Sequence, residues 1–253
     1  MSQRSIFCRF CGASGSHRYG KTRTGRQRFQ CPHCNKTFTR RTNTTKSGSQ
    51  LSDYQWKVAI RLFSTRAGMS AADLARFLDI NRKTAQRLNR AFRSLTNDLI
   101  PKKLPGTSEW DEAVISRQWM LGGVSRATRK CLIQCIPNRR AITLVPLVEK
   151  HSDAEGMIMT DEWLGYHDII NRWSVCHARE FVRPEARFVH TNTQEGIWSH
   201  LKGLSRHTYR GFPVSSLSQF LAEFMFRYNL RDYDTRVSVL SALLTRKTNS
   251  LLV

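Results

Sequence analysis

Three acidic residues, Asp111, Asp161 and Glu195, have the types and positions that could carry metal-dependent chemistry. Asp111 lies beside Trp110 in a predicted strand, and Asp161 ends a short apolar strand. Ligand sites in open α/β sheets lie at strand ends, so carboxylates from separate elements can converge there. Converging carboxylates repel one another unless a cation is present, and oxygen ligands suit Mg²⁺ or Mn²⁺. Two such ions, roughly 4 Å apart, can activate a water or a 3′-hydroxyl and stabilise the leaving oxygen of a phosphodiester.

The third carboxylate lies near the start of a predicted helix. Asn192 is the expected N-cap of this helix, and Glu195 completes a capping-box spacing. Glu195 and Lys202 are two helical turns apart, so they project from nearly the same side. This pair could help bind a metal and hold a phosphate beside it. The alternative is that Glu195 only caps its own helix.

Four cysteines near the N-terminus form two CxxC pairs, Cys8 with Cys11 and Cys31 with Cys34, separated by 19 residues. Two such pairs can bind one structural Zn²⁺ ion, with the intervening chain folded as a short hairpin. A redox role is the alternative for a single pair, but two pairs without a βαβ pattern favour zinc. Three other cysteines lie among apolar residues and are expected to be buried: Cys131, Cys135 and Cys176.

The charge is strongly basic and unevenly distributed. The chain has 41 Lys and Arg against 19 Asp and Glu, a net charge of +22, and residues 1–50 contain no acidic residue. A strongly basic N-terminal part, followed by a chain in which the charges are more balanced, suggests a polyanion-binding module. Arg26 and Arg28 of the hairpin are candidate phosphate contacts. The sequence shows neither an apolar run of about 18 residues nor a signal peptide. We therefore expect a soluble cytoplasmic, nucleoid-associated protein with no membrane partner.

Residues 51–100 are predicted to be helical. A short helix at 71–78, a tight turn and a basic helix from Arg82 resemble helix-turn-helix DNA-binding domains, in which the second helix enters the major groove. The alternative is a solvated basic face, including Arg90 and Arg93, on a structural helical bundle. Four residues of the second helix are the candidates for contact with bases or phosphates: Arg82, Lys83, Gln86 and Arg87.

After a Pro- and Gly-rich break, the pattern changes to alternating strands and helices. Strands are expected at 109–115, 118–124, 130–136, 157–160 and 174–176, and helices at 168–173, from 192, and at 215–228. Residues 141–151 could be a helix or an apolar strand. This order favours a mixed sheet covered by helices. The chain is thus expected to be multidomain, with the following parts: a zinc ribbon at 1–40, a basic linker at 41–50, a helix-turn-helix domain at 51–100, a linker at 101–108, an α/β catalytic domain at 109–235 and a tail at 236–253.

Four motifs in this order resemble those of bacterial insertion-sequence transposases of the Asp-Asp-Glu type, in the subgroup with an N-terminal zinc ribbon. They are Glu109-Trp110-Asp111-Glu112, Thr160-Asp161-Glu162-Trp163, His190-Thr191-Asn192-x2-Glu195-Gly196-x-Trp198-x2-Leu201-Lys202-Gly203 and Phe224-x-Phe226-Arg227-Tyr228-Asn229. The resemblance implies a ribonuclease-H-like catalytic domain. Its first Asp lies in the first strand, its second follows the fourth strand, and its third acidic residue lies on a later helix.

These roles fall on Asp111, Asp161 and Glu195, and Lys202 matches a basic residue that holds DNA phosphate near the site. Members of this subgroup often have Asn in the third position, so Asn192 is a rival ligand. His177 also resembles the family, without an assigned role.

The resemblance implies binding of double-stranded DNA, both the element's terminal inverted repeats and its target. It also implies metal-dependent strand cleavage, transfer of 3′-hydroxyls with two Mg²⁺ or Mn²⁺ ions, and a homo-oligomer on DNA. The alternatives are a domesticated, inactive DNA-binding protein and a metal-dependent nuclease that does not join strands.

Overall fold

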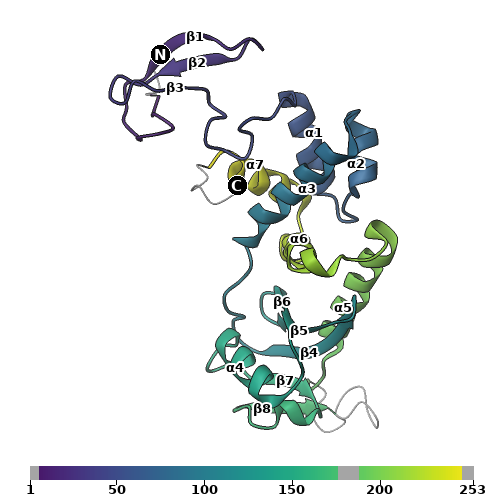
Figure 1. The fold of residues 1–253 in the computed structure, drawn as a ribbon. Coiled ribbons are helices and arrows are strands. Elements are labelled where there is room, and N and C mark those ends of the chain that lie inside the picture. The colour runs from purple at the N-terminus through teal and green to yellow at the C-terminus, as the bar shows by residue number, and fades with distance from the viewer. Residues whose placement is uncertain (1–5, 176–187, 247–253) are drawn as a thin grey trace. The chain divides into compact units, whose positions relative to one another are not determined.

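The computed structural model describes residues 6–175 and 188–246 (Figure 1). They form two compact units, which are considered separately. The first comprises the described residues of Met1–Lys57 and Ser238–Val253, and the second is Val58–Val237. None of the helices in the described ranges combines the length and apolarity that a membrane crossing requires.

The first unit contains a small antiparallel sheet in the order β1-β2-β3. Its strands are β1 (His17–Lys21), β2 (Gln27–Gln30) and β3 (Thr37–Phe38). The core consists of Phe29 and Phe38 with Cys8 and Cys31. So small a core buries little apolar surface, which is why a structural metal matters to such a segment. The antiparallel pairing of β1 with β2 confirms the expected hairpin.

The segment expected to be a basic linker forms a series of turns in this unit. The Arg41 guanidinium donates to the Leu51 carbonyl at 2.9 Å and pairs with Asp53 at 2.6 Å. The Lys46 ammonium lies 5.5 Å from the centre of the Trp56 ring. Basic side chains of this segment thus stabilise its own turns.

Three helices follow: α1 (Asp53–Phe63), α2 (Ala71–Leu78) and α3 (Arg82–Asn97). Ser70 caps α2 by accepting from the Asp73 N–H at 3.1 Å, and Asn81 caps α3 by accepting from the Thr84 N–H at 2.8 Å. Asp79, in the left-handed region, ends α2 and leaves a tight turn before α3. The expected starts of α2 and α3 are confirmed.

A five-stranded mixed sheet, in the order β6-β5-β4-β7-β8, forms the centre of the second unit. Its first three strands, β4 (Ser108–Ile115), β5 (Gln118–Ser125) and β6 (Cys131–Ile136), are antiparallel neighbours. The other two, β7 (Ile158–Asp161) and β8 (Arg172–Val175), run parallel to β4.

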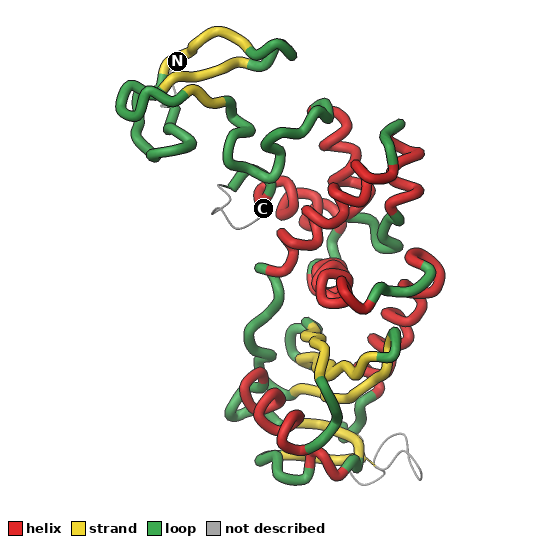
Figure 2. Tube along the Cα trace, viewed as in Figure 1, coloured by secondary structure: helices red, strands yellow, loops and turns green. Residues whose placement is uncertain are grey.

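Helices cover both faces of this sheet (Figure 2). Helices α5 (Asn192–Leu204) and α6 (Leu217–Asn229) bury one face, and α4 (Ala141–His151) buries the other. The remaining elements are η1 (Leu164–Tyr166), the π-helix η2 (Ser205–Tyr209), η3 (Val214–Ser216) and α7 (Tyr233–Leu243). The three-layer arrangement agrees with the expected covered mixed sheet.

Two local expectations were wrong. Residues 168–173 do not form a helix, because Arg172 and Trp173 already pair with β7 as the start of β8. Cys135 is exposed rather than buried, whereas Cys131 is in the core. Cys176 and His177 lie outside the described residues.

Candidate functional site

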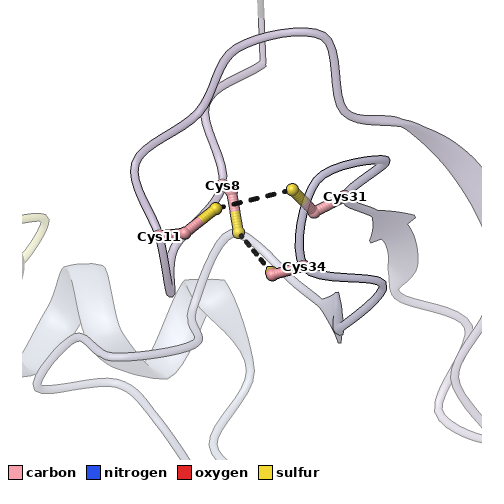
Figure 3. Close-up of side chains that lie close together, drawn as sticks. All are labelled: Cys8, Cys11, Cys31 and Cys34. Carbon is pink, nitrogen blue, oxygen red and sulfur yellow. Dashed lines mark hydrogen bonds between the residues drawn. The ribbon is translucent and has the colours of Figure 1, made fainter.

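The four N-terminal cysteines lie together in the first unit (Figure 3). The Sγ atoms of Cys8 and Cys34 are 3.7 Å apart, and those of Cys11 and Cys31 are 3.6 Å apart. A tetrahedral Zn²⁺ ion with metal–sulfur bonds of about 2.3 Å requires sulfurs about 3.8 Å apart. The cluster can therefore hold one such ion.

The two CxxC pairs have the same backbone geometry. The Gly12 N–H donates to the Cys8 carbonyl, and the Asn35 N–H donates to the Cys31 carbonyl. Gly12 and Asn35 both have positive φ, at 82° and 56°, so each pair closes with a left-handed residue. These two turns place the four sulfurs around one point.

The backbone favours the thiolate form of Cys8 and Cys31, whereas at Cys11 the Ala13 N–H is outweighed by burial and the neighbouring thiols, which raise the pKa of Cys11 to about 11. Burial raises the pKa of the Cys8 thiol, but N–H groups of Cys11 and Phe10 and the neighbouring thiols lower it to about 6 overall. A thiolate is the form that binds metal. The chemistry of the donors thus agrees with their geometry.

A second cluster, of carboxylates, lies in the five-stranded sheet. Asp111 and Glu112 are adjacent in β4, and Asp161 is the last residue of β7, which pairs with β4. One oxygen from each of the three lies within 4.8 Å of the others. The convergence expected for Asp111 and Asp161 is therefore present, and Glu112 is an additional member that the sequence reasoning missed.

This carboxylate cluster is electrostatically costly without a cation. Burial, followed by the charge of Asp161, raises the pKa of Asp111 to about 6. Burial, followed by the charges of Asp161 and Asp111, raises the pKa of Glu112 to about 7. Three oxygen donors under mutual repulsion are the kind of set that Mg²⁺ or Mn²⁺ binds.

Helix α5 packs closely on the sheet next to this cluster. The Trp198 indole N–H donates to the Asp111 carboxylate at 3.0 Å. A Cβ on Gly122 would lie 2.3 Å from Gln194 Nε2 and 2.6 Å from the Trp198 ring. Only glycine at position 122 therefore leaves room for α5 at this distance from β5.

A buried carboxylate of the sheet caps α5. Glu109, fully buried in β4, accepts from the Thr193 N–H at 2.8 Å and the Gln194 N–H at 3.1 Å. Arg126 donates to the same carboxylate at 2.8 Å and to the His190 carbonyl at 2.7 Å. An anion is favourable at this helix end because the first N–H groups have no partner within the helix.

The expected N-cap of α5 was wrong. The N-cap is Thr191, without a side-chain cap bond, and Asn192 is the first helical residue. The capping role expected of Asn192 is taken by Glu109, which is distant in the sequence.

The remaining expected residues of α5 do not belong to the three-carboxylate cluster. Glu195, Asn192 and Lys202 are exposed on the helix. Glu195 nevertheless acts on the cluster, because its charge contributes to the raised pKa of Asp111.

The candidate DNA-contacting residues of α3 are exposed as a group. They follow the capped start of the helix and comprise Arg82, Lys83, Gln86 and Arg87. The same helix buries Ala85, Leu88 and Phe92. Arg93 was expected on the basic face, but it is buried.

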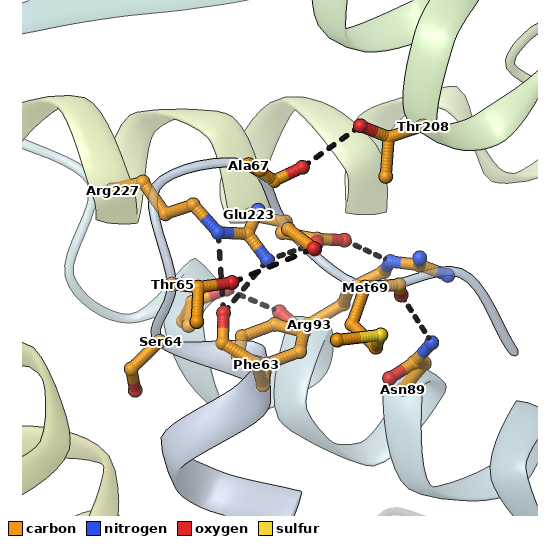
Figure 4. A network of polar contacts seen from close by, with 12 residues as sticks. Phe63, Ser64, Thr65, Ala67, Met69, Asn89, Arg93, Thr208, Glu223 and Arg227 are labelled. Carbon is orange, nitrogen blue, oxygen red and sulfur yellow. Dashed lines mark hydrogen bonds and ion pairs between the residues drawn. The ribbon is translucent and has the colours of Figure 1, made fainter. Parts of the chain in front are cut away.

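Arg93 belongs to an ion cluster that joins α3 to α6 (Figure 4). Glu223 of α6 pairs with both Arg93 and Arg227, and the Tyr209 hydroxyl donates to it. Arg227 also donates to the Phe63 carbonyl at 2.8 Å. The helical segment α1–α3 is thereby linked to helices that cover the sheet.

The hairpin arginines of the first unit are partly engaged in internal contacts. Arg26 donates to the Ser49 carbonyl at 3.2 Å and the Leu51 carbonyl at 3.3 Å. Arg28 donates to the Thr37 hydroxyl at 3.3 Å. Both side chains are half-buried. Their role as DNA contacts stays a prediction.

Clustered carboxylates that can hold a divalent metal, together with an exposed basic helix in the same unit, are compatible with an enzyme that processes nucleic acids. Comparison with protein families places the chain more narrowly: residues 109–229 match the ISXO2-like transposase domain. This match supports an insertion-sequence transposase of the Asp-Asp-Glu type, and the cluster of Asp111, Glu112 and Asp161 is compatible with it. No curated protein gives a significant match.

Proposed function

We propose that this transposase binds the terminal inverted repeats of its element, cleaves the DNA strand ends and joins their 3′-hydroxyls to target DNA. The observation that carries the proposal is the gathering of Asp111, Glu112 and Asp161 within a transposase domain. The strand order β6-β5-β4-β7-β8, with Asp111 in its central strand, supports a ribonuclease-H-like fold.

The three carboxylates would hold Mg²⁺ or Mn²⁺, with Glu195 or Asn192 of α5 completing a two-ion site. The bound ions would activate the attacking oxygen and stabilise the leaving oxygen. The protein's own residues position the reacting groups. Trp198 orients the Asp111 carboxylate, and Glu109 fixes the start of the helix that presents Glu195. Lys202 would bind a DNA phosphate on the same side of α5 as Glu195.

The surrounding parts would provide DNA recognition. The exposed basic start of α3 would enter the major groove, as the second helix of a helix-turn-helix pair does. The cysteine cluster would hold Zn²⁺ and support the basic hairpin against the phosphate backbone. A homo-oligomer would bring two element ends together, and the site of action would be the bacterial nucleoid.

The test is strand cleavage and joining on duplexes that carry the element's own ends, with Mg²⁺ or Mn²⁺. We expect Asp111→Asn, Glu112→Gln and Asp161→Asn to lose activity about a thousandfold while DNA binding is kept, since several kcal/mol of charge stabilisation would be lost. Glu162→Gln is the matched control, because Glu162 is exposed beside Asp161 and outside the carboxylate cluster. Glu195→Ala and Asn192→Ala, compared separately, identify the fourth ligand.

Each alternative gives a different result. Cleavage without joining would identify a nuclease. A wild-type protein that binds the ends and does not cleave them would identify a domesticated DNA-binding protein. Carboxylate variants as active as wild type would refute the site assignment.

A further inference from the structure

A cavity of about 420 Å³ lies between helices α5 and α6 and the segment that follows α1. None of its lining residues belongs to the carboxylate cluster. Its volume falls within the range of small-molecule sites, about 300–1,000 Å³. The proposed transposition chemistry leaves this cavity without a role.

Three of the residues that line the cavity are arginines: Arg66, Arg227 and Arg231. Among the described residues, no carboxylate lines it. The single negative charge of Glu223 is shared between Arg227 and Arg93, so the group of Glu223, Arg227 and Arg93 keeps a net positive charge. Arg227 is buried, and its Nη1 has no hydrogen-bond partner among the described residues. Arg66 and Arg231 are exposed, so their guanidinium groups can donate to an anion in the cavity.

Three further residues that line the cavity carry aromatic rings. Phe224 and Tyr228 are stacked with ring centroids 5.9 Å apart, and the His200 ring lies edge-on to Phe224 at 5.7 Å. Leu204 completes this apolar wall. Nucleic-acid bases bind by stacking on exposed aromatic faces, at about 1–3 kcal/mol per base. Tyr228 is half-buried, and the exposed Arg231 guanidinium lies 5.8 Å from its ring centre, so a base that stacks on this ring would lie beside or replace Arg231 there.

We propose that this cavity is a nucleotide-binding site, with the phosphate held by Arg66, Arg227 and Arg231 and the base placed on Tyr228. An inorganic anion alone would not need the aromatic wall, and an apolar ligand would not need the three arginines. The nucleotide could come from an unpaired position of a DNA strand or from a free nucleotide, because both present the same chemistry. The first source rests on the proposed function, and the second does not.

His200 provides a local reporter of occupancy. Burial and the positive charge of Arg66 lower the pKa of this imidazole. A phosphate between the two side chains would offset that charge and raise the pKa again. The ring resonances of His200, identified by their loss in His200→Gln, can be followed by NMR in the full chain. The probes are thymidine monophosphate, inorganic phosphate, a short single-stranded oligothymidine and a blunt duplex.

We expect thymidine monophosphate to shift the His200 resonances at lower concentration than inorganic phosphate does. Arg66→Ala and Arg231→Ala remove exposed side chains, and each should weaken nucleotide binding about tenfold, the value of one charge-assisted hydrogen bond. Arg140→Ala is the matched control, since Arg140 is exposed and does not line the cavity. Tyr228→Leu should weaken binding of the mononucleotide and leave that of phosphate unchanged, with thermal melting used to verify folding.

Equal affinity for phosphate and mononucleotide, or no shift with either probe, would overturn the proposal. An equal loss of binding in Arg140→Ala would do the same. Tighter binding of the single-stranded oligomer than of the duplex and the mononucleotide would identify a DNA strand as the source. Binding of the mononucleotide as tight as that of the oligomer would identify a free nucleotide. The mononucleotide titration involves no strand cleavage, so its result is independent of whether Asp161→Asn abolishes cleavage.

Discussion

Glu112 is the residue at which the site differs most from the arrangement expected from the sequence. It is adjacent to Asp111 in β4, and successive strand residues point to opposite faces. That alternation favours only one of the two as a ligand. The oxygens of both nevertheless lie within one cluster with Asp161. The Oε1 atom of Glu112 is buried and has no hydrogen-bond partner among the described residues, as expected of an oxygen that coordinates a cation.

The raised carboxyl pKa values predict a pH-dependent stability in the metal-free protein. Glu112 has a pKa of about 7 in the fold against an ordinary value of 4.5, so the native state binds its proton more tightly than the unfolded chain does. Its contribution to stability is present below about pH 4.5 and is lost as the pH rises to about 7. As the pH rises through this range, the free energy of unfolding of the wild type should therefore fall relative to that of Glu112→Gln. Urea unfolding at several pH values measures the difference.

The control for this prediction is Glu162→Gln, in which an exposed carboxylate is changed. Its difference from wild type should be small and flat over the same pH range. Mg²⁺ should restore the stability of wild type at pH 7 and have less effect on Glu112→Gln, because the cation replaces the proton. A pH-independent difference between wild type and Glu112→Gln would show that Glu112 titrates normally.

At the scale of elements, the position of α5 depends on a cap that comes from the sheet. Glu109→Gln would remove the buried charge that faces Arg126 and two N–H groups of α5. Breaking one partner of a buried ion pair costs about 3–5 kcal/mol. We expect a loss of that size in the free energy of unfolding, together with weaker cleavage. The exposed Glu155→Gln is the control, and equal stability of the two variants would contradict the capping role.

The close approach of α5 to β5 gives a second prediction at this scale. Gly122→Ala would place a methyl group against the Trp198 ring and Gln194, so overpacking should cost about 1–3 kcal/mol and displace the helix. Gly203→Ala, within α5, meets no atom within 4 Å and should be neutral or stabilising by up to about 1 kcal/mol. Thermal melting compares the two variants. Destabilisation of both to the same extent would indicate a general intolerance of the region rather than close packing.

The elements differ in how far the sequence predicts them. Helices α2 and α3 were predictable because Ser70 and Asn81 cap N–H groups only three residues away. The cap of α5 was not, because its acceptor Glu109 lies more than eighty residues earlier in the chain. The start of strand β8 was missed for a similar reason, since pairing with β7 overrides local preference in residues 172–173. The proximity of Asp111 and Asp161 was predictable because ligand sites in α/β sheets lie at strand ends. The place of Glu112 in the same cluster became evident only from the three-dimensional structure.

At the scale of the whole molecule, one buried acid links the helical segment to the sheet-covering helices. Burial alone would raise the pKa of Glu223, but the charges of Arg227 and Arg93 lower it, so the carboxylate is ionised. Glu223→Gln would leave two guanidiniums buried without their counter-charge and should cost about 3–5 kcal/mol. The exposed Glu149→Gln is the matched control in urea unfolding. If Glu223→Gln lowered the free energy of unfolding no more than Glu149→Gln does, the Glu223 ion cluster would not contribute to stability.

The division into two units predicts that zinc stabilises only one of them. The core around β1–β3 is small and includes Cys8 and Cys31, so zinc bound by the four cysteines would supply much of its folding energy. A strong chelator should therefore abolish the NMR signals of folded residues 6–38, while those of the Val58–Val237 unit persist. Cys8→Ser should lose the bound zinc, whereas the exposed Cys135→Ser should retain one equivalent. Purified wild type without zinc, or chelation that unfolds both units together, would contradict this division of stability.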